Sequence, residues 1–489
     1  MESFENQTVT ASEAAESDAS PTAIRHAENK MGTMPIPRLL VSMSLPMVVS
    51  MLVQALYNVV DSIFVSKYDQ AAMTAVTLAF PAQTLLIASA VGTGVGINAL
   101  LSYSLGKKDR TGVNNAASHG IFLYAIYAVV FCILGFTLAG PFIRSQFTKR
   151  DFAENYDLTM KTIRYGKDYL SIVMGCSAGM FFQVLLERLL QSTGKTIYSM
   201  ITQGTGAIIN IFLDYALVFG HFGLPRMGVK GAAVATVIGQ CVAALIGLYF
   251  NLRKNKEVSL SMRGFRLHAA TLRNIYKVAF PSILMQAIAS VITFILNKLL
   301  IGFTTDAVTV FGIYFKIQSF IFMPVFGFNS GMVPILAYNY GARRKKRMLE
   351  TLRLSYFIAA GIMLVGTILF WTIPEQLLAL FSEDAESLET LVTYGKPAFH
   401  YISLHFIAAS FSIITISVFQ ALGNGLYATI VSVCRQVVIL LPVAWFMAKV
   451  VKRLEFVWLS YPIAEAASAL MCAFFLIRIY RKQISSLPD

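Results

Sequence analysis

Two apolar stretches of the chain carry carboxylate and amide side chains at helical spacing. Each stretch has one aspartate and two amides, which are Gln54, Asn58 and Asp61 in the first and Gln203, Asn210 and Asp214 in the second. At these separations the side chains of each set lie on roughly one face of an α-helix. A charge inside a membrane is costly, so it usually marks a transport pathway or a binding partner.

Two carboxylates with neighbouring amide oxygens suit two kinds of ion. They could form an oxygen cage for a hard cation such as Na+, or one carboxyl could hold a proton, because burial and a like-charged neighbour both favour its neutral form. We interpret Asp61, Asn210 and Asp214 as residues that bind a coupling ion, either H+ or Na+. The expected supporting residues are Asn58, Gln54 and Gln203. The alternative is that the two aspartates simply reach water near the ends of their helices.

The composition predicts an all-α integral membrane protein. Hydrophobic residues make up 56% and charged residues 13% of the 489 residues, and the mean hydropathy is +0.63. An apolar helix of about 20 residues spans a bilayer, and the apolar runs here lack the period-2 alternation of a β-barrel. We predict twelve spans, near residues 39–64, 73–103, 116–140, 166–190, 196–220, 230–250, 274–301, 308–338, 352–373, 394–421, 427–449 and 456–479.

The distribution of charge predicts how these helices are oriented. A net charge of +14 could indicate a nucleic-acid partner, but Lys and Arg gather in the loops after the second, sixth and eighth spans, as the positive-inside rule expects. An acidic loop within residues 375–389 lies on the opposite side. We therefore predict that both termini are cytoplasmic and that no nucleic acid is bound. The five cysteines are far apart and odd in number, which indicates neither a disulfide framework nor a metal site.

The second half of the sequence repeats the first. Matching pairs are Pro46 and Pro281, Gly92 and Gly327, and Gly106 and Gly341 at a shift of about 235 residues, then Gly194 and Gly423 at about 229. Six spans is an even number, so both halves enter the membrane from the same side, as parallel repeats about an axis along the membrane normal. The predicted segments are a disordered polar tail (1–33), an N-lobe (34–250), a basic cytoplasmic linker (251–273), a C-lobe (274–480) and a C-terminal tail (481–489).

The two aspartates have no counterpart in the second repeat. Asp61 aligns with Leu296, and Asp214 aligns with Val443. A purely structural carboxylate would be expected in both copies, so this asymmetry favours the hypothesis that the first half binds the coupling ion. Glu187 shares a helix face with two glutamines near the cytoplasmic end of its span, which favours a solvated or paired role.

Enzymatic and nucleotide-binding motifs are incomplete in this chain. The run 192–196 resembles the end of a phosphate-binding loop, but Leu189 stands where that pattern requires glycine. No metal-ligand spacing and no nucleophile–base set is evident. We therefore expect a transporter that is not an enzyme, with no nucleotide and no cofactor other than the coupling ion.

Three motifs resemble those of the multidrug and toxic compound extrusion (MATE) family, in its prokaryotic branch. They are Tyr57–Asp61, Gly206–Asp214 and Met227–Ala233. The resemblance implies two six-helix lobes in a V shape, located in a bacterial cell (plasma) membrane. It also places Asp61, Asn210 and Asp214 at the family's cation-site positions. Tyr215 departs from the proline of many relatives, which could alter the bend of its span, and the seventh span lacks the glutamate of a second-lobe cation site.

The function expected from this resemblance is secondary active antiport. The protein would export organic, often cationic and aromatic, compounds in exchange for H+ or Na+, by alternating access of two lobes in the lipid bilayer, as a monomer. We expect Tyr57, Gln83 and Gln318 to line the substrate cavity. The alternatives are a flippase for a lipid-linked glycan or other lipid-like substrate and, from a different class, a membrane-embedded enzyme.

Overall fold

The computed structural model describes residues 29–488 except 148–151, 154, 301 and 382–384. Within these residues the chain forms helices and no strand. Eight spans are single helices, namely α2 (Ile36–Tyr68), α3 (Gln70–Gly106), α4 (Arg110–Arg144), α8 (Thr196–Phe219), α9 (Val229–Lys254), α10 (Ala269–Leu300), α11 (Thr305–Gly341) and α12 (Lys345–Thr372). The predicted all-α membrane fold is confirmed.

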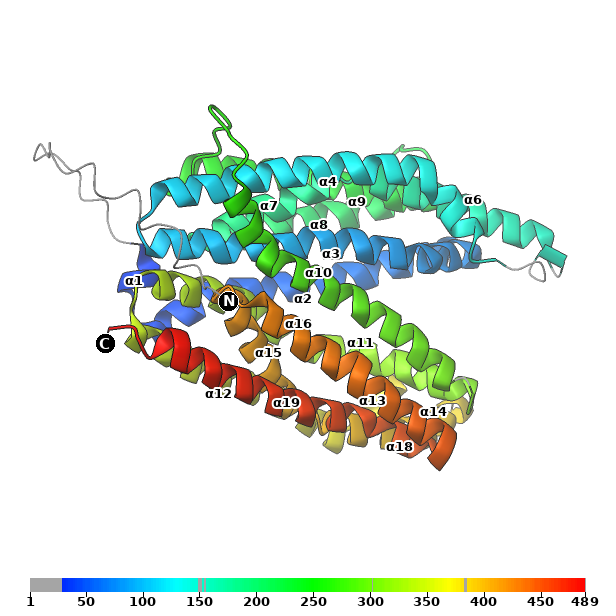
Figure 1. Cartoon of the computed structure of the whole chain (residues 1–489). Coiled ribbons are helices and arrows are strands. Elements are labelled where there is room, and N and C mark those ends of the chain that lie inside the picture. Colours follow the sequence, from blue (N-terminus) through cyan, green and yellow to red (C-terminus); the bar gives the residue numbers. More distant parts are fainter. Residues whose placement is uncertain (1–28, 148–151, 154, 301, 382–384, 489) are drawn as a thin grey trace, which may run out of the picture.

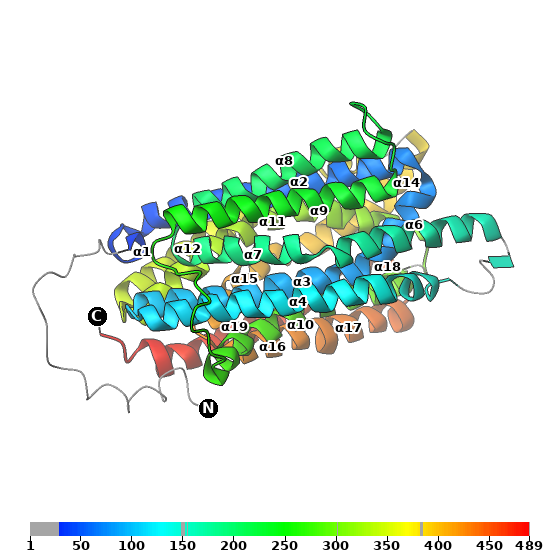
Figure 2. The same ribbon diagram turned by 90° about the horizontal axis from the view of Figure 1, so that it is seen from above.

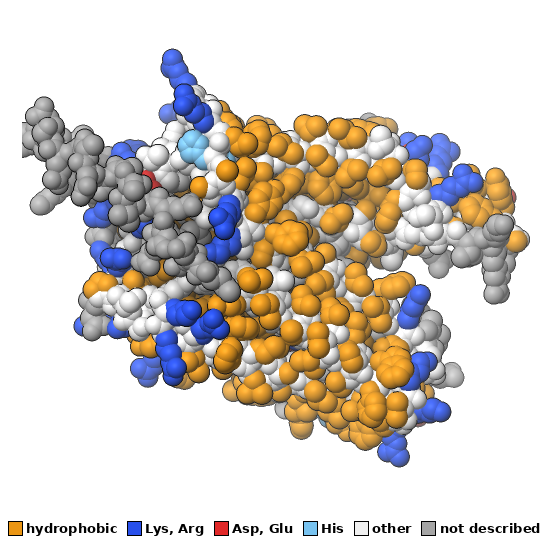
Figure 3. Space-filling view, in the orientation of Figure 1, with side chains coloured by type: hydrophobic (Ala, Val, Ile, Leu, Met, Phe, Trp, Pro, Cys, Tyr) orange, Lys and Arg blue, Asp and Glu red, His pale blue; other side chains and the backbone are white. Residues whose placement is uncertain are grey.

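Two further spans contain π-helical turns. One runs through α16 (Gly425–Val433), η1 (Cys434–Leu440), α17 (Leu441–Phe446) and η2 (Met447–Val451). The other runs through α18 (Leu454–Trp458), α19 (Ser460–Ile479) and η3 (Tyr480–Ile484). Hydrophobic side chains cover the middle of the molecule and Lys and Arg gather toward its two ends, as expected for a membrane-spanning bundle (Figure 3).

The two remaining spans, one in each bundle, are broken into two helices, which the sequence did not predict. The span predicted at 166–190 is α6 (Tyr156–Gly175) followed by α7 (Ala178–Ser192), with a bend of 45°. The span predicted at 394–421 is α14 (Ala385–Ser403) followed by α15 (Phe406–Ala421), with a bend of 48° between its described halves. The two bent pairs bring the total to twelve spans. In contrast, α2 and α10 continue through Pro46 and Pro281.

The spans form two bundles that diverge toward one end of the molecule (Figure 1). Helices α2 to α9 form the first bundle, and α10 to α19 form the second. They meet where α2 packs against α11 and α3 packs against α10. The molecular surface is indented between the bundles at the end opposite α1 (Figure 3). At the α1 end the bundles are in close contact.

Reciprocal glycine contacts confirm the two-fold repeat predicted from the sequence. A β-carbon added to Gly106 would overlap the carbonyl oxygen of Tyr338, and one added to Gly341 would overlap that of Tyr103. The shift of 235 residues relates Gly106 to Gly341 and Tyr103 to Tyr338, so each contact is the symmetry copy of the other. Two repeats related by a two-fold axis produce such reciprocal contacts. Two further reciprocal sets are Gly92 with Ile283 and Gly327 with Val48, then Gly96 with Ala279 and Gly331 with Ser44.

The short helix α1 (Lys30–Thr33) lies where the bundles meet. The Asn29 side chain donates 3.0 Å hydrogen bonds to the Thr193 carbonyl and the Glu257 carboxylate, while Arg347 donates to the carbonyls of Met31 and Met34. We expected residues 1–33 to be a disordered tail. That expectation is wrong for residues 29–33, because side chains from both bundles satisfy their polar groups; residues 1–28 lie outside the described part.

The connection between the bundles is shorter than the predicted linker 251–273. Helix α9 extends to Lys254 and α10 begins at Ala269. The buried side chains of Asn251 and Asn255 donate to the carbonyls of Leu186 and Leu189 in α7, at 3.0 and 3.3 Å. These bonds fasten the end of α9 to the first bundle.

Asp69 joins α2 to α3 at the end opposite α1, and it supports a prediction about stability. Its carboxylate accepts hydrogen bonds from Lys161 of α6, at 2.5 Å, and from the Ala71 amide, at 2.9 Å. The bond to Lys161 is the main cause that lowers the pKa of Asp69. A carboxyl group whose pKa is lowered on folding stabilises the folded protein at pH values above its ordinary pKa. This stabilisation is lost as the pH falls through the lowered pKa.

We therefore expect Asp69→Ala to lower the thermal unfolding temperature at pH 7 and to have less effect at a pH below the ordinary carboxyl pKa. The lost helix cap alone should cost about 1 kcal/mol. Thermal unfolding of the purified protein at both pH values measures this difference. Lys161→Ala is the matched control and should show the same trend. An equal effect at both pH values would contradict the proposed role of the ion pair.

Candidate functional site

The three residues expected to bind an ion come together between α2 and α8, which lie side by side (Figure 2). Asn210 and Asp214 are one turn apart on α8 and are buried, at 3% and 0% exposure. Asp61 reaches them from α2. The carboxyl groups of Asp61 and Asp214 are close enough for each to influence the charge of the other.

Four oxygen atoms of this cluster have no hydrogen-bond partner among the described residues. They are Oδ1 of Asp61, Oδ1 of Asn210 and both carboxylate oxygens of Asp214, and all four are buried. The amide nitrogen of Asn210 donates to Thr236 Oγ1 at 3.3 Å, so its oxygen remains available. A buried polar atom without a partner costs free energy. A bound proton or a hard cation would supply what these oxygens lack.

Close packing of α8 on α9 positions Asn210. A β-carbon on Gly206 would lie 2.9 Å from the β-carbon of Ala243, and one on Gly239 would lie 2.8 Å from the Gly206 carbonyl oxygen. Only glycine permits this approach, because it has no side chain. The crossing brings Thr236 of α9 within hydrogen-bonding distance of Asn210.

The expected supporting amides have other roles or none in this conformation. Gln203 Nε2 donates to Gln54 Oε1 at 2.9 Å, a bond that links α8 to α2. This bond uses one of the two lone pairs of the Gln54 oxygen. Asn58 is exposed, and its side chain makes no hydrogen bond within the described part of the chain.

Two of the three expected cavity residues lie near the aspartates. Tyr57 of α2 lies within electrostatic range of both Asp61 and Asp214. Gln83 of α3 donates to the hydroxyl of Tyr169 at 3.1 Å, and Tyr169 also lies near both aspartates. Gln318 lies on α11 in the other bundle and makes no hydrogen bond to these residues in the described structure.

Tyr169 and Thr236 were not among the residues predicted for the site. Tyr169 lies one helical turn after Tyr165, and the run Tyr165–Lys167 recurs as Tyr394–Lys396 at the shift of 229 residues, so that spacing could have indicated Tyr169. Thr236 follows the third family motif by three residues and carried no separate signal. Both residues contact the site across helix interfaces that a single sequence does not reveal.

Glu187 and Tyr215 lie in settings that the sequence left open. Glu187 is 8% exposed and accepts a 3.0 Å hydrogen bond from Gln183, so it is paired and not solvated. Tyr215 is 43% exposed and stacks on His221 with ring centres 4.5 Å apart. Helix α8 is continuous through Tyr215.

The residues that could hold a metal are limited. No group of three or more His, Cys, Asp or Glu residues suited to a metal ion occurs among the residues that the structure describes. A sodium ion needs only carboxylate and amide oxygens, and Asp61, Asn210 and Asp214 supply both kinds.

Two symmetry-related six-span bundles, the first of which holds the aspartate cluster, are typical of a membrane transporter. The MatE family model matches residues 46–216 and again residues 281–446, one match in each bundle. Together these matches cover more than half of the chain. The chain therefore belongs to the MATE family of multidrug efflux transporters, which is not an enzyme family.

Curated relatives agree with this assignment. The chain is 27% identical to the multidrug export protein MepA of Staphylococcus saprophyticus over 443 residues, covering 90% of this chain and 93% of that protein. It is 27% identical to the probable multidrug resistance protein NorM of Thermotoga maritima over 354 residues, covering 72% and 73%.

Two solved structures share the fold. An outward-facing multidrug resistance MATE transporter of the MOP superfamily aligns with a TM-score of 0.84 at 24% identity, over 93% of this chain and 98% of that one. A MOP superfamily transporter from Pyrococcus furiosus, whose binding pocket is described as reversed in polarity, aligns with a TM-score of 0.85 at 24% identity, over 95% and 99%.

Proposed function

We propose that this protein is an antiporter that exports organic, often cationic and aromatic, compounds in exchange for H+ or Na+. The observation that supports it most is the cluster of four buried, unpartnered oxygens on Asp61, Asn210 and Asp214. These atoms lie in one bundle near Tyr57, which is expected in the substrate cavity. The relatives named for multidrug export support the same substrate class.

The proposed orientation follows from charge. Basic loops favour the cytoplasmic side, so the α1 end and both termini face the cytoplasm of a bacterial cell and the indented end faces outward. The protein acts as a monomer in the lipid bilayer and uses no nucleotide or cofactor besides the coupling ion.

The proposed cycle is alternating access. In the described conformation an ion from outside neutralises the pair formed by Asp61 and Asp214. Neutralisation changes the packing of α2 against α8 and favours conformations in which the bound compound is released outward. Coupling of this kind requires the ion and the compound to prefer different conformations, and the effect is reciprocal.

Efflux of a fluorescent organic cation from proteoliposomes tests the proposal. A sodium gradient and a proton gradient are imposed separately, in otherwise identical vesicles. Acceleration by one gradient supports antiport and identifies the ion. Efflux of a broad panel of cations that responds to neither gradient would contradict it.

A further inference from the structure

The second bundle contains a buried ion pair that the proposed cycle does not use. Arg435 of η1 donates from Nη1 to Oε2 of Glu465 in α19 at 3.0 Å, with side-chain exposures of 25% and 5%. The other carboxylate oxygen of Glu465, Oε1, is buried and has no hydrogen-bond partner among the described residues. The pair is therefore only half satisfied.

The repeat places this pair opposite the aspartate site. A shift of 229 residues superposes the buried positions of α9 and α19, which pair as Gly231 with Ser460, Ala235 with Ala464, Gly239 with Ser468 and Ala243 with Cys472. In this register Glu465 is the counterpart of Thr236, the residue bonded to Asn210 in the first bundle. Glu465 thus occupies the position that borders the ion site in the other repeat.

The architecture of the bundle does not require the pair. Arg435 is the counterpart of Gly206, where the first bundle brings α8 and α9 into backbone contact. In the second bundle this helix is π-helical from Cys434 to Leu440. Such local widening is common at functional sites. Replacing a buried ion pair by apolar residues is often neutral or stabilising, so its presence suggests a role other than stability.

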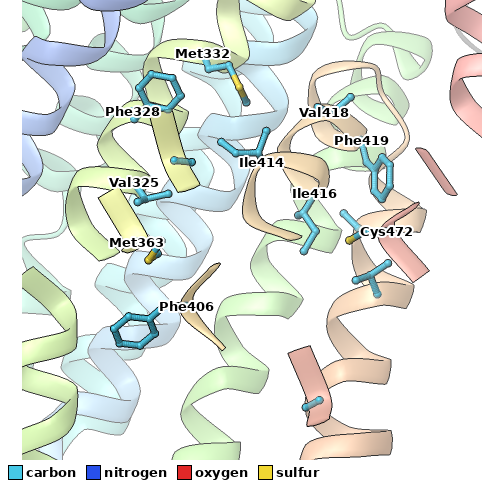
Figure 4. Packing of buried hydrophobic residues seen from close by; sticks show 14 of the residues in the cluster. Val325, Phe328, Met332, Met363, Phe406, Ile414, Ile416, Val418, Phe419 and Cys472 are labelled. Atoms are coloured by element: carbon cyan, nitrogen blue, oxygen red, sulfur yellow. The ribbon is translucent and has the colours of Figure 1, made fainter. Parts of the chain in front are cut away.

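Other titratable groups surround Glu465. The ring of His405, at the start of α15, lies 5.7 Å from that of Tyr461, one turn before Glu465 on α19. Cys472, two turns after Glu465, lies between α19 and α15 near Ile416 (Figure 4). Ser412 and Ser468 bond to each other at 3.3 Å and do not reach the carboxylate. Among the groups near Glu465, Arg435 and His405 can carry positive charge and Tyr461 and Cys472 are neutral at pH 7.

We propose that Glu465 is a proton-binding site in the second bundle, which accepts a proton on Oε1 as its bond to Arg435 opens. A metal cation is disfavoured there, because the guanidinium lies 3.0 Å from the carboxylate. The step is a simple proton transfer: an O–H bond forms on Glu465, the proton comes from solution at the indented end, and no electron is transferred.

In the described conformation Glu465 is paired with Arg435. Proton uptake then favours conformations in which η1 and α19 have separated, because a ligand shifts the population toward the state that binds it better. The role of Glu465 in transport rests on the proposed antiport, but its ability to bind a proton does not.

Infrared difference spectroscopy between alkaline and acidic pH tests proton binding directly. The protonated-carboxyl bands of Asp61→Asn/Asp214→Asn are compared with those of the same protein carrying Glu465→Gln in addition. The triple variant is expected to lack one band that the double variant shows. When Arg435→Met is added to the double variant and removes the guanidinium, that band should appear at a higher pH. Identical spectra of the double and triple variants would overturn the proposal.

A charge-balanced variant separates a proton site from a structural ion pair. Arg435→Met combined with Glu465→Gln removes both charges and should keep the wild-type thermal stability. It should export with one proton fewer per molecule of substrate, measured in proton-gradient vesicles. Export with the wild-type proton count would refute the role in transport. If instead the aspartate site proved unimportant, the infrared result for Glu465 would still decide this proposal.

Discussion

Asp214→Asn is expected to abolish gradient-driven export while the protein remains folded. Asparagine has nearly the same shape, but it neither carries the negative charge nor exchanges a proton. Coupling between two sites is typically worth 5–150-fold, so we expect a loss of roughly 100-fold in export driven by the gradient. Proteoliposome efflux with the coupling gradient imposed measures it, and binding of the fluorescent compound should persist.

The control for this variant is Asp306→Asn, which makes the same chemical change at the start of α11 in the other bundle. It should export at the wild-type rate. Asp61→Asn should resemble Asp214→Asn, and the double variant should be little worse than either, because residues that act as a unit are not additive. Full gradient-driven export by both single variants would refute the assigned role.

Gly106→Ala is expected to disfavour the conformation described here. Its added methyl group would overlap the Tyr338 carbonyl where the bundles meet at the α1 end. Overpacking of this kind typically costs 1–3 kcal/mol, and the cost applies only while that end is closed. The population should therefore shift toward conformations open at the α1 end by about tenfold for each 1.4 kcal/mol, and export should slow.

Spin labels at Lys107 and Arg343, in a background without the native cysteines, measure this shift by their distance distribution. The variant should gain a longer-distance population. Gly361→Ala in α12 is the matched control, because a β-carbon there has no atom within 4 Å. Distance distributions that are the same in Gly106→Ala and the wild type would show that this contact does not control closure.

The sequence predicted the fold and the main cluster because both depend on periodicity. Apolar runs indicated the spans, and their even number per repeat indicated the two-fold axis. The positions of Asp61 and Asp214 on their helix faces were enough to suggest that they meet. Their closeness in the structure agrees with that prediction, while the ion that they bind remains a proposal.

The remaining features depend on contacts between helices that are distant in sequence. The break before His405 and the pairing of Arg435 with Glu465 leave no periodic signal. Gln54 was expected to support the site because it shares a face with Asp61, and its bond to Gln203 across the two helices was not predicted. The docking of residues 29–34 depends on Thr193 in one bundle and Arg347 in the other, which the composition of a polar tail does not reveal.

The affinity for a transported compound, measured as a function of pH and of sodium concentration, tests the central claim most directly. In the wild type we predict that affinity falls either as the pH falls or as sodium rises, according to the coupling ion. In Asp61→Asn/Asp214→Asn this dependence should shrink markedly while the compound still binds. An ion dependence undiminished in the double variant would contradict the assignment of Asp61, Asn210 and Asp214 as the coupling site.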